Sequence, residues 1–142
     1  MKLPLTGSCS CGAVHLAAET GPQAMYRCHC KGCQETFHAA FAPVAVFGAD
    51  DVSVRGELAL ATSPRGGAHH GRSVCRACGD TVLMHGEPGA RVVLIPVAVL
   101  DDAGWFRPVA DIWTVHAEPA AVMDYRIPKV LKSPPILGGE PV

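Results

Sequence analysis

Seven cysteines in this sequence have a spacing that would let them do chemistry together. They fall into three clusters, which read Cys9-Ser10-Cys11, Cys28-His29-Cys30-Lys31-Gly32-Cys33 and Cys75-Arg76-Ala77-Cys78. Thiolates this close in the chain can bind one tetrahedral metal ion, for which the zinc–sulfur distance is about 2.3 Å. The spacing therefore predicts zinc sites, and the odd number of cysteines argues against a framework of disulfides.

The first and third clusters contribute two cysteines each, and each pair is followed by a glycine, Gly12 or Gly79. Glycine permits the sharp turn that wraps the backbone around a metal ion. We expect the two pairs to form one closed site of four thiolates that contributes folding free energy rather than catalysis. The predicted ligands of this structural zinc are Cys9, Cys11, Cys75 and Cys78.

The middle cluster places Cys28, Cys30 and Cys33 within six residues. If these three alone hold a zinc ion, water or a substrate atom can occupy the fourth position, as catalysis requires. The alternative is a closed site with a histidine as fourth ligand, and the candidates are His29, His38, His69 and His70. A redox group with the C-x-x-C spacing is a third interpretation, although no βαβ pattern surrounds it.

Length and composition fit one globular domain: the chain has 142 residues, of which 49% are hydrophobic and 18% charged. The net charge of −1, without a basic run, gives no indication of nucleic acid binding. No apolar run approaches the roughly 20 residues of a membrane span, and the N-terminus lacks the pattern of a signal peptide. We therefore expect a cytoplasmic protein that binds neither nucleic acid nor membrane. A reducing compartment favours thiols that bind metal.

Short apolar and β-branched segments bounded by Gly, Pro, Asp or Ser predict a mainly β domain. The expected strands are 13–17, 39–47, 51–55, 58–62, 81–85, 91–99 and 111–117. Pro43 predicts that the second of these is an edge strand or carries a bulge. Segment 63–71 is expected to be a loop that borders a site. We assign 1–130 to a single zinc-binding domain and 131–142 to an extended or disordered tail rich in Pro and Gly.

The cysteine motifs resemble those of the glutathione-dependent formaldehyde-activating enzyme family, which includes centromere protein V-like proteins. In the family order they read Gly7-Ser8-Cys9-Ser10-Cys11-Gly12-Ala13-Val14, Cys28-His29-Cys30-Lys31-Gly32-Cys33 and Cys75-Arg76-Ala77-Cys78-Gly79. Leu100-Asp101-Asp102 and Asp111-Ile112-Trp113 are similar to the C-terminal half of the family. The resemblance implies an Mss4-like fold of several small coiled antiparallel β-sheets built around zinc.

The resemblance also implies an activity. A member of the family would be a zinc-dependent carbon-sulfur lyase or synthase. It would act on an adduct of glutathione, or another small thiol, with formaldehyde or a related aldehyde. The resemblance implies two zinc ions per chain, with Cys28, Cys30 and Cys33 as the catalytic ligands and the substrate thiol as the fourth ligand. The competing interpretation is a non-catalytic binding module stabilised by zinc.

Three further residues are candidates for supporting roles. Glutathione carries two carboxylates, so Arg65 or Arg72, which precede the third cysteine cluster, could bind one of them in bidentate geometry. Each arginine could equally be a solvated loop residue. His29 lies between two predicted ligands and is expected to pack beside the metal site, with a role as proton carrier as the alternative. The oligomeric state is not predicted.

Overall fold

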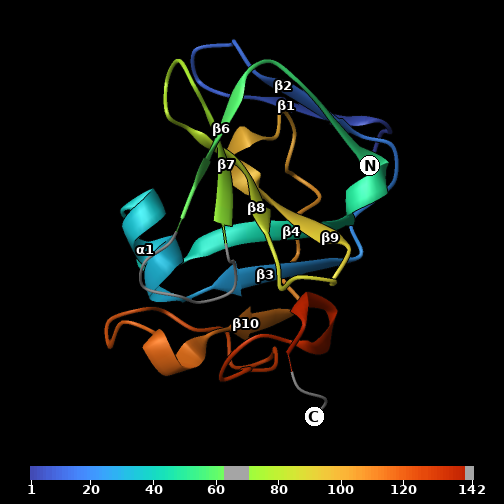
Figure 1. Cartoon of the computed structure of the whole chain (residues 1–142). Coiled ribbons are helices and arrows are strands. Elements are labelled where there is room, and N and C mark those ends of the chain that lie inside the picture. The colour runs from blue at the N-terminus through green and yellow to red at the C-terminus, as the bar shows by residue number, and fades with distance from the viewer. Residues whose placement is uncertain (63–70, 140–142) are drawn as a thin grey trace.

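The computed structural model describes residues 1–62 and 71–139, and its fold is mainly β (Figure 1). Within these residues a three-stranded sheet and a seven-stranded sheet are accompanied by one short α-helix. The prediction of a mainly β, Mss4-like protein is confirmed. None of the helices in the described residues is long and apolar enough to cross a membrane.

The smaller sheet is antiparallel, with the strand order β1-β2-β5. Its strands are β1 (Leu5–Ser8), β2 (His15–Ala18) and β5 (Val52–Arg55). Leu16 and Ala18 are buried while the residues before them are more exposed, as expected for a strand with one face on the core. Because β1 ends directly before Cys9, this sheet positions the first cysteine pair.

The larger sheet has the order β10-β3-β4-β9-β8-β7-β6. Every neighbouring pair is antiparallel except β10 and β3, which are parallel. The strands are β3 (Ala24–Cys28), β4 (Ala42–Gly48), β6 (Leu58–Ala61), β7 (Gly71–Cys75), β8 (Thr81–His85), β9 (Val92–Pro96) and β10 (Ala110–Ile112). Two cysteine clusters therefore begin at strand ends, because β3 ends at Cys28 and β7 at Cys75.

Strand β4 separates two hydrophobic cores. Its residues Val44 and Val46 belong to one core, and Ala45 and Phe47 belong to the other. Successive side chains of a strand point to opposite faces of the sheet, so the two cores lie on opposite faces. One core packs against the smaller sheet, and the other contains all three cysteines of the middle cluster.

The segment between β3 and β4 contains helix α1 (Lys31–Phe37), which contacts β4 (Figure 1). This helix was not expected from the sequence. The remaining helical elements in the described residues are single 3-10 turns. They are η1 (Ala49–Asp51), η2 (Val97–Val99), η3 (Thr114–His116) and η4 (Pro135–Leu137).

Each of the seven expected strands overlaps a strand of the structure, but two of them end early. The segment expected at 91–99 leaves the sheet after Pro96 and continues as η2, and the segment expected at 111–117 leaves it after Ile112 and continues towards η3. Three strands were missed, namely β1, β3 and β7. These lie close to cysteine motifs, where Gly, Ser and Cys interrupt the apolar pattern.

The expectation for Pro43 was wrong, because β4 is not an edge strand. It lies between β3 and β9, and neither pairing shows a shift of register. Pairing with β9 begins at Val44, one residue after the proline. The missing N–H of Pro43 therefore removes no hydrogen bond to β9, which is why a central strand can contain a proline near its start.

The C-terminal segment is not an extended tail over its whole length. Pro135–Leu137 form η4, and Leu137 is completely buried in the core that contains the middle cysteine cluster. The domain boundary at residue 130 stays a prediction. Residues 63–70 of the loop expected at 63–71, which include Arg65, His69 and His70, lie outside the described residues, as do residues 140–142, while Gly71 begins β7.

Candidate metal centres

The first and third cysteine clusters come together as predicted. The four sulfurs of Cys9, Cys11, Cys75 and Cys78 all lie within 4.8 Å of one another. The Sγ atom of Cys11 is 3.6 Å from that of Cys9 and 3.7 Å from that of Cys75. A tetrahedron with zinc–sulfur bonds of about 2.3 Å has sulfurs roughly 3.8 Å apart, so this donor set fits one zinc ion.

Two similar turns build this four-cysteine site. The N–H of Gly12 donates to the carbonyl of Cys9 at 3.1 Å, and the N–H of Gly79 donates to the carbonyl of Cys75 at 2.8 Å. Gly12 has φ 77° and Gly79 has φ 78°, a conformation that glycine adopts without strain. A Cβ atom at either glycine would meet nothing within 4 Å. The turns therefore require glycine for its conformation rather than for lack of space.

Two thiols of the four-cysteine site, those of Cys9 and Cys11, have pKa values shifted in opposite directions. Burial acts to raise the pKa of Cys9, but the N–H of Val14 and hydrogen bonds from the other three thiols outweigh it and lower that pKa to about 6. The N–H of Ala13 acts to lower the pKa of Cys11, but its bond to the Cys9 sulfur and burial raise it to about 12. Without a cation, the four thiols cannot all ionise at neutral pH, so the set suits a divalent metal.

The middle cluster is formed by the end of β3 and the start of α1. Cys30 is the N-cap of the helix, and its Sγ accepts a hydrogen bond from the N–H of Cys33 at 3.3 Å. The exposed fractions of Cys28, Cys30 and Cys33 are 0%, 0% and 1%. Their sulfurs lie within 4.8 Å of one another, and no histidine nitrogen or carboxylate in the described part of the chain belongs to the set.

Two thiols of the middle cluster, those of Cys28 and Cys33, have a raised pKa. Burial raises the pKa of Cys28 well above its ordinary value, and hydrogen bonds with Cys28 and Cys30, together with burial, raise the pKa of Cys33. A buried thiolate needs a cation or several hydrogen-bond donors beside it. Three soft sulfur donors fit zinc, and no group from the described residues joins them at the fourth position of a tetrahedron.

His29 is held by a buried carboxylate rather than by the cysteines. Its Nε2 lies 2.8 Å from Oδ1 of Asp111, and both side chains are fully buried. Arg27 donates to the same carboxylate through Nε at 2.8 Å and through a terminal nitrogen at 2.9 Å. Lys129 Nζ lies 3.1 Å from its Oδ2. Burial acts to raise the pKa of Asp111, but these three partners outweigh it and lower that pKa.

This network follows from the parallel pairing of β10 with β3, which places Asp111 opposite Arg27. Sequence analysis missed the roles of Arg27, Asp111 and Lys129. Burial of a charged residue is rare, and nothing in the local sequence signals it. The other ring nitrogen of His29, Nδ1, is buried without a hydrogen-bond partner in the described residues. Because Nδ1 is not part of the sulfur set, a site closed by His29 is not what the structure shows.

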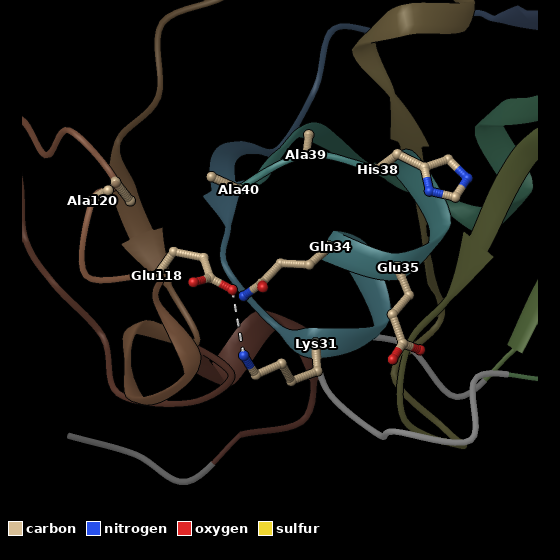
Figure 2. Close-up of a pocket in the computed structure, with 9 residues that line it drawn as sticks. Lys31, Gln34, Glu35, His38, Ala39, Ala40, Glu118 and Ala120 are labelled. Atoms are coloured by element: carbon tan, nitrogen blue, oxygen red, sulfur yellow. Dashed lines mark ion pairs between the residues drawn. The ribbon is translucent and has the colours of Figure 1, made fainter.

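Two cavities lie beside α1. One, of about 730 Å³, is lined by residues that include Cys9, Phe37, His38 and Arg72. The other is an open groove of about 610 Å³ along the opposite side of the helix, where Lys31 Nζ lies 3.6 Å from Glu118 Oε1 (Figure 2). The lining residues known from the described part of the chain include none of the three cysteines of the middle cluster.

Of the other histidine and arginine candidates, the structure describes His38 and Arg72. His38 ends α1 in the left-handed conformation, with φ 50°, and lines both cavities without joining the cysteines. Arg72 lies on β7 and lines the 730 Å³ cavity. The structure does not test the roles assigned to Arg65, His69 and His70.

Comparisons with known proteins identify relatives at the level of family and fold. The sequence matches the family model described as glutathione-dependent formaldehyde-activating enzyme over residues 4–116. No significant match was found among curated proteins. The fold is similar to the crystal structure of a Rhodobacter sphaeroides protein, with a TM-score of 0.55 and 23% sequence identity. That similarity covers 88% of this chain and 99% of the other. The chain belongs to the glutathione-dependent formaldehyde-activating enzyme family.

Proposed function

We propose that the protein is a zinc-dependent carbon-sulfur lyase or synthase. Its substrate would be the adduct of glutathione, or another small thiol, with formaldehyde or a related aldehyde. The observation that carries the proposal is the middle cluster, in which three buried sulfurs lie within 4.8 Å of one another. Membership of the family supports glutathione and formaldehyde as the reactants.

Two zinc ions per chain are part of this proposal. Cys9, Cys11, Cys75 and Cys78 would hold the structural ion, and Cys28, Cys30 and Cys33 would hold the catalytic one. A zinc ion with three protein thiolates supplies a fourth position at which a substrate thiol binds and loses its proton. The His29–Asp111 contact would keep the backbone between Cys28 and Cys30 in place.

The proposed reaction needs no oxidant or reductant. The sulfur of the thiol adds to the carbonyl carbon of the aldehyde, so that one C–S bond forms and the carbonyl π bond breaks. The proton that the thiol loses ends on the new hydroxyl group, and the lyase direction reverses these changes. The protein would hold thiol and aldehyde together, which converts a bimolecular encounter into a step within one complex.

One observation favours the alternative of a zinc-stabilised binding module. The three sulfurs of the middle cluster are buried, and none of the three cysteines is among the described residues that line the cavities beside α1. In that case both zinc ions would only hold loops in place. The two functions predict different results when one cysteine ligand is replaced in each cluster.

The variants Cys33→Ser and Cys78→Ser test this difference. Cys33→Ser should stay folded, lose about one zinc ion per chain and lose glutathione-dependent consumption of formaldehyde. Cys78→Ser should unfold, because its site joins residues 9–11 to residues 75–78. Zinc content, circular dichroism and formaldehyde consumption are the measurements. Equal unfolding of both variants would support the binding module instead.

We also propose that the protein works in the cytoplasm. All seven cysteines have free thiols in the structure, and a reducing compartment keeps thiols available for metal ions. Glutathione, or a similar small thiol, is the proposed partner.

A further inference from the structure

The 730 Å³ cavity beside α1 has the size and lining of a small-molecule site. Its volume falls in the range of roughly 300–1,000 Å³ that is usual for ligand pockets. Residues from four distant parts of the chain line it, including Ser10 after β1, Thr36 of α1, Thr81 of β8 and Asp101. Hydroxyl groups, a guanidinium group and carboxylates converge on this space, which we call the α1–β7 cavity.

Arg72 brings a positive charge to the cavity. A terminal nitrogen of its guanidinium group donates to Oγ1 of Thr81 at 3.0 Å. Its Nε is buried and has no hydrogen-bond partner among the described residues. A buried donor without a partner costs free energy, which a bound acceptor would recover. A carboxylate is the acceptor that matches the planar guanidinium fork.

Two carboxylates, those of Asp80 and Asp101, line the same cavity. Asp80 Oδ2 accepts a hydrogen bond from the N–H of Ser10 at 2.7 Å, and Asp101 Oδ2 accepts one from Thr6 Oγ1 at 2.7 Å. An inorganic dianion in the cavity would therefore be repelled by two aspartates. A ligand that carries both an ammonium group and a carboxylate matches the mixed charges better.

Phe37 connects this cavity to the middle cysteine cluster. Its side chain lines the cavity and also packs against the core that contains Cys28, Cys30 and Cys33. In α1, Phe37 comes four residues after Cys33, and residues with this spacing lie on the same helix face. Helix α1 therefore contributes both to the cavity, through Phe37, and to the three-sulfur cluster, through Cys33.

We propose that the α1–β7 cavity binds the amino-acid part of the substrate thiol, with Arg72 holding a substrate carboxylate. The substrate class is a small thiol with an ammonium group and at least one carboxylate, of which glutathione is one. This inference rests on the proposed function, because the thiol of the ligand acts at the middle cluster.

The groove on the other side of α1 suits such a ligand less well. Lys31 is already paired with Glu118, and the side-chain amide of Gln34 donates to the carbonyls of His29 and His116 at 2.7 and 2.9 Å. In Figure 2 the side chains of Lys31 and Gln34 both point towards Glu118 across this groove. Lys31 and Gln34 therefore already have partners within the protein.

The test is a calorimetric titration of the zinc-loaded protein with S-methylglutathione, whose blocked sulfur cannot act as a thiolate. Arg72→Gln should weaken binding by about 10- to 100-fold, since a charge-assisted hydrogen-bonded pair is lost. Arg72→Lys keeps the charge but not the planar guanidinium group, so its affinity should lie between those of the wild type and Arg72→Gln. Arg91→Gln is the control, because it removes an equal charge from an exposed residue that is not among those lining the cavity. Equal affinity of Arg72→Gln and the wild type, or no binding by the wild type, would overturn the inference.

Cobalt substitution separates this inference from the proposed function. 2-Mercaptoethanol has a thiol but no charged group, so it should change the cobalt spectrum equally in the wild type and in Arg72→Gln. If it does so while Arg72→Gln binds S-methylglutathione normally, the cavity assignment is wrong and the proposed function stands. If no thiol changes the spectrum but Arg72→Gln loses S-methylglutathione, the cavity assignment stands and the lyase proposal fails.

Discussion

Asp111 shows how single residues hold the middle cysteine cluster in place. Its carboxylate is fully buried and accepts contacts from Arg27, His29 and Lys129. A buried carboxylate with several charged partners is strongly coupled to them, because removing one charge leaves the others unpaired in a medium of low dielectric constant. Through His29, this coupling reaches the backbone between two of the predicted metal ligands.

Replacing Asp111 with asparagine should therefore destabilise the fold. We expect Asp111→Asn to lower the free energy of unfolding by about 3 kcal/mol or more, because Arg27 and Lys129 lose their counter-charge. Urea unfolding of the zinc-loaded protein is the measurement. Asp124→Asn is the matched control, since the described partner of the Asp124 side chain is the exposed Arg126 and the change should cost little. Equal stability of the two variants would contradict this account.

At the scale of elements, α1 has only seven residues and depends on its surroundings. An isolated helix of this length is not stable in water. Its N-terminus is capped by the thiol of Cys30, and Gln34 ties it to the carbonyls of His29 and His116. These contacts fix the helix that supplies Cys33.

Gln34→Ala should destabilise the protein by about 1–2 kcal/mol, because two carbonyls lose their hydrogen-bond donor. It should also speed the removal of metal from the middle cluster by a chelator, since α1 is held less firmly. Lys31→Met on the same helix removes only the ion pair with Glu118 and should cost less than about 1 kcal/mol. Thermal unfolding and the rate of metal release measure both effects. If Lys31→Met lowers stability and speeds metal release more than Gln34→Ala does, Gln34 is not the residue that holds α1 in place.

The same elements show what could be predicted from the sequence. The cysteine sets could be predicted because their spacing is local and thiol chemistry is restrictive. Helix α1 could not, because two turns with Gly32 inside them give no hydrophobic period. Strand β1 contains Gly7, where a Cβ atom would lie 2.3 Å from the carbonyl oxygen of Val99, so tertiary packing overrides its weak strand propensity.

Long-range contacts also limit how much of the site could be predicted from the sequence. Asp111 meets His29 across 82 residues of sequence, through a parallel strand pair that no local pattern reveals. The same is true of the α1–β7 cavity, which brings Ser10, Phe37 and Arg72 to one space. Sequence analysis named Arg72 as a candidate, but only the fold places it in a cavity beside α1.

At the scale of the whole molecule, each face of the larger sheet carries a core, and each core contains cysteines of one predicted zinc site. The C-terminal segment completes the core that contains the middle cluster, because Leu137 of η4 is completely buried there. The segment expected to be a tail therefore contributes to the fold.

Leu137→Ala should lower the free energy of unfolding by about 2–5 kcal/mol, the usual cost of removing a buried leucine side chain. Leu131→Ala changes the same residue type at a site that is 70% exposed and should stay within about 0.5 kcal/mol of the wild type. Chemical unfolding at equilibrium compares the two. If both variants match the wild type, the C-terminal segment does not pack in solution as the structure shows.

The central claim is that the middle cluster holds a metal ion with a position open to an external thiol. The most direct measurement is the visible spectrum of the cobalt-substituted protein during a titration with glutathione, because cobalt reports the number and geometry of its thiolate ligands. We predict a saturable change in the thiolate-to-cobalt bands as a fourth sulfur binds. An unchanged spectrum, with two fully coordinated tetrahedral sites, would contradict the claim and show that both metal ions are structural.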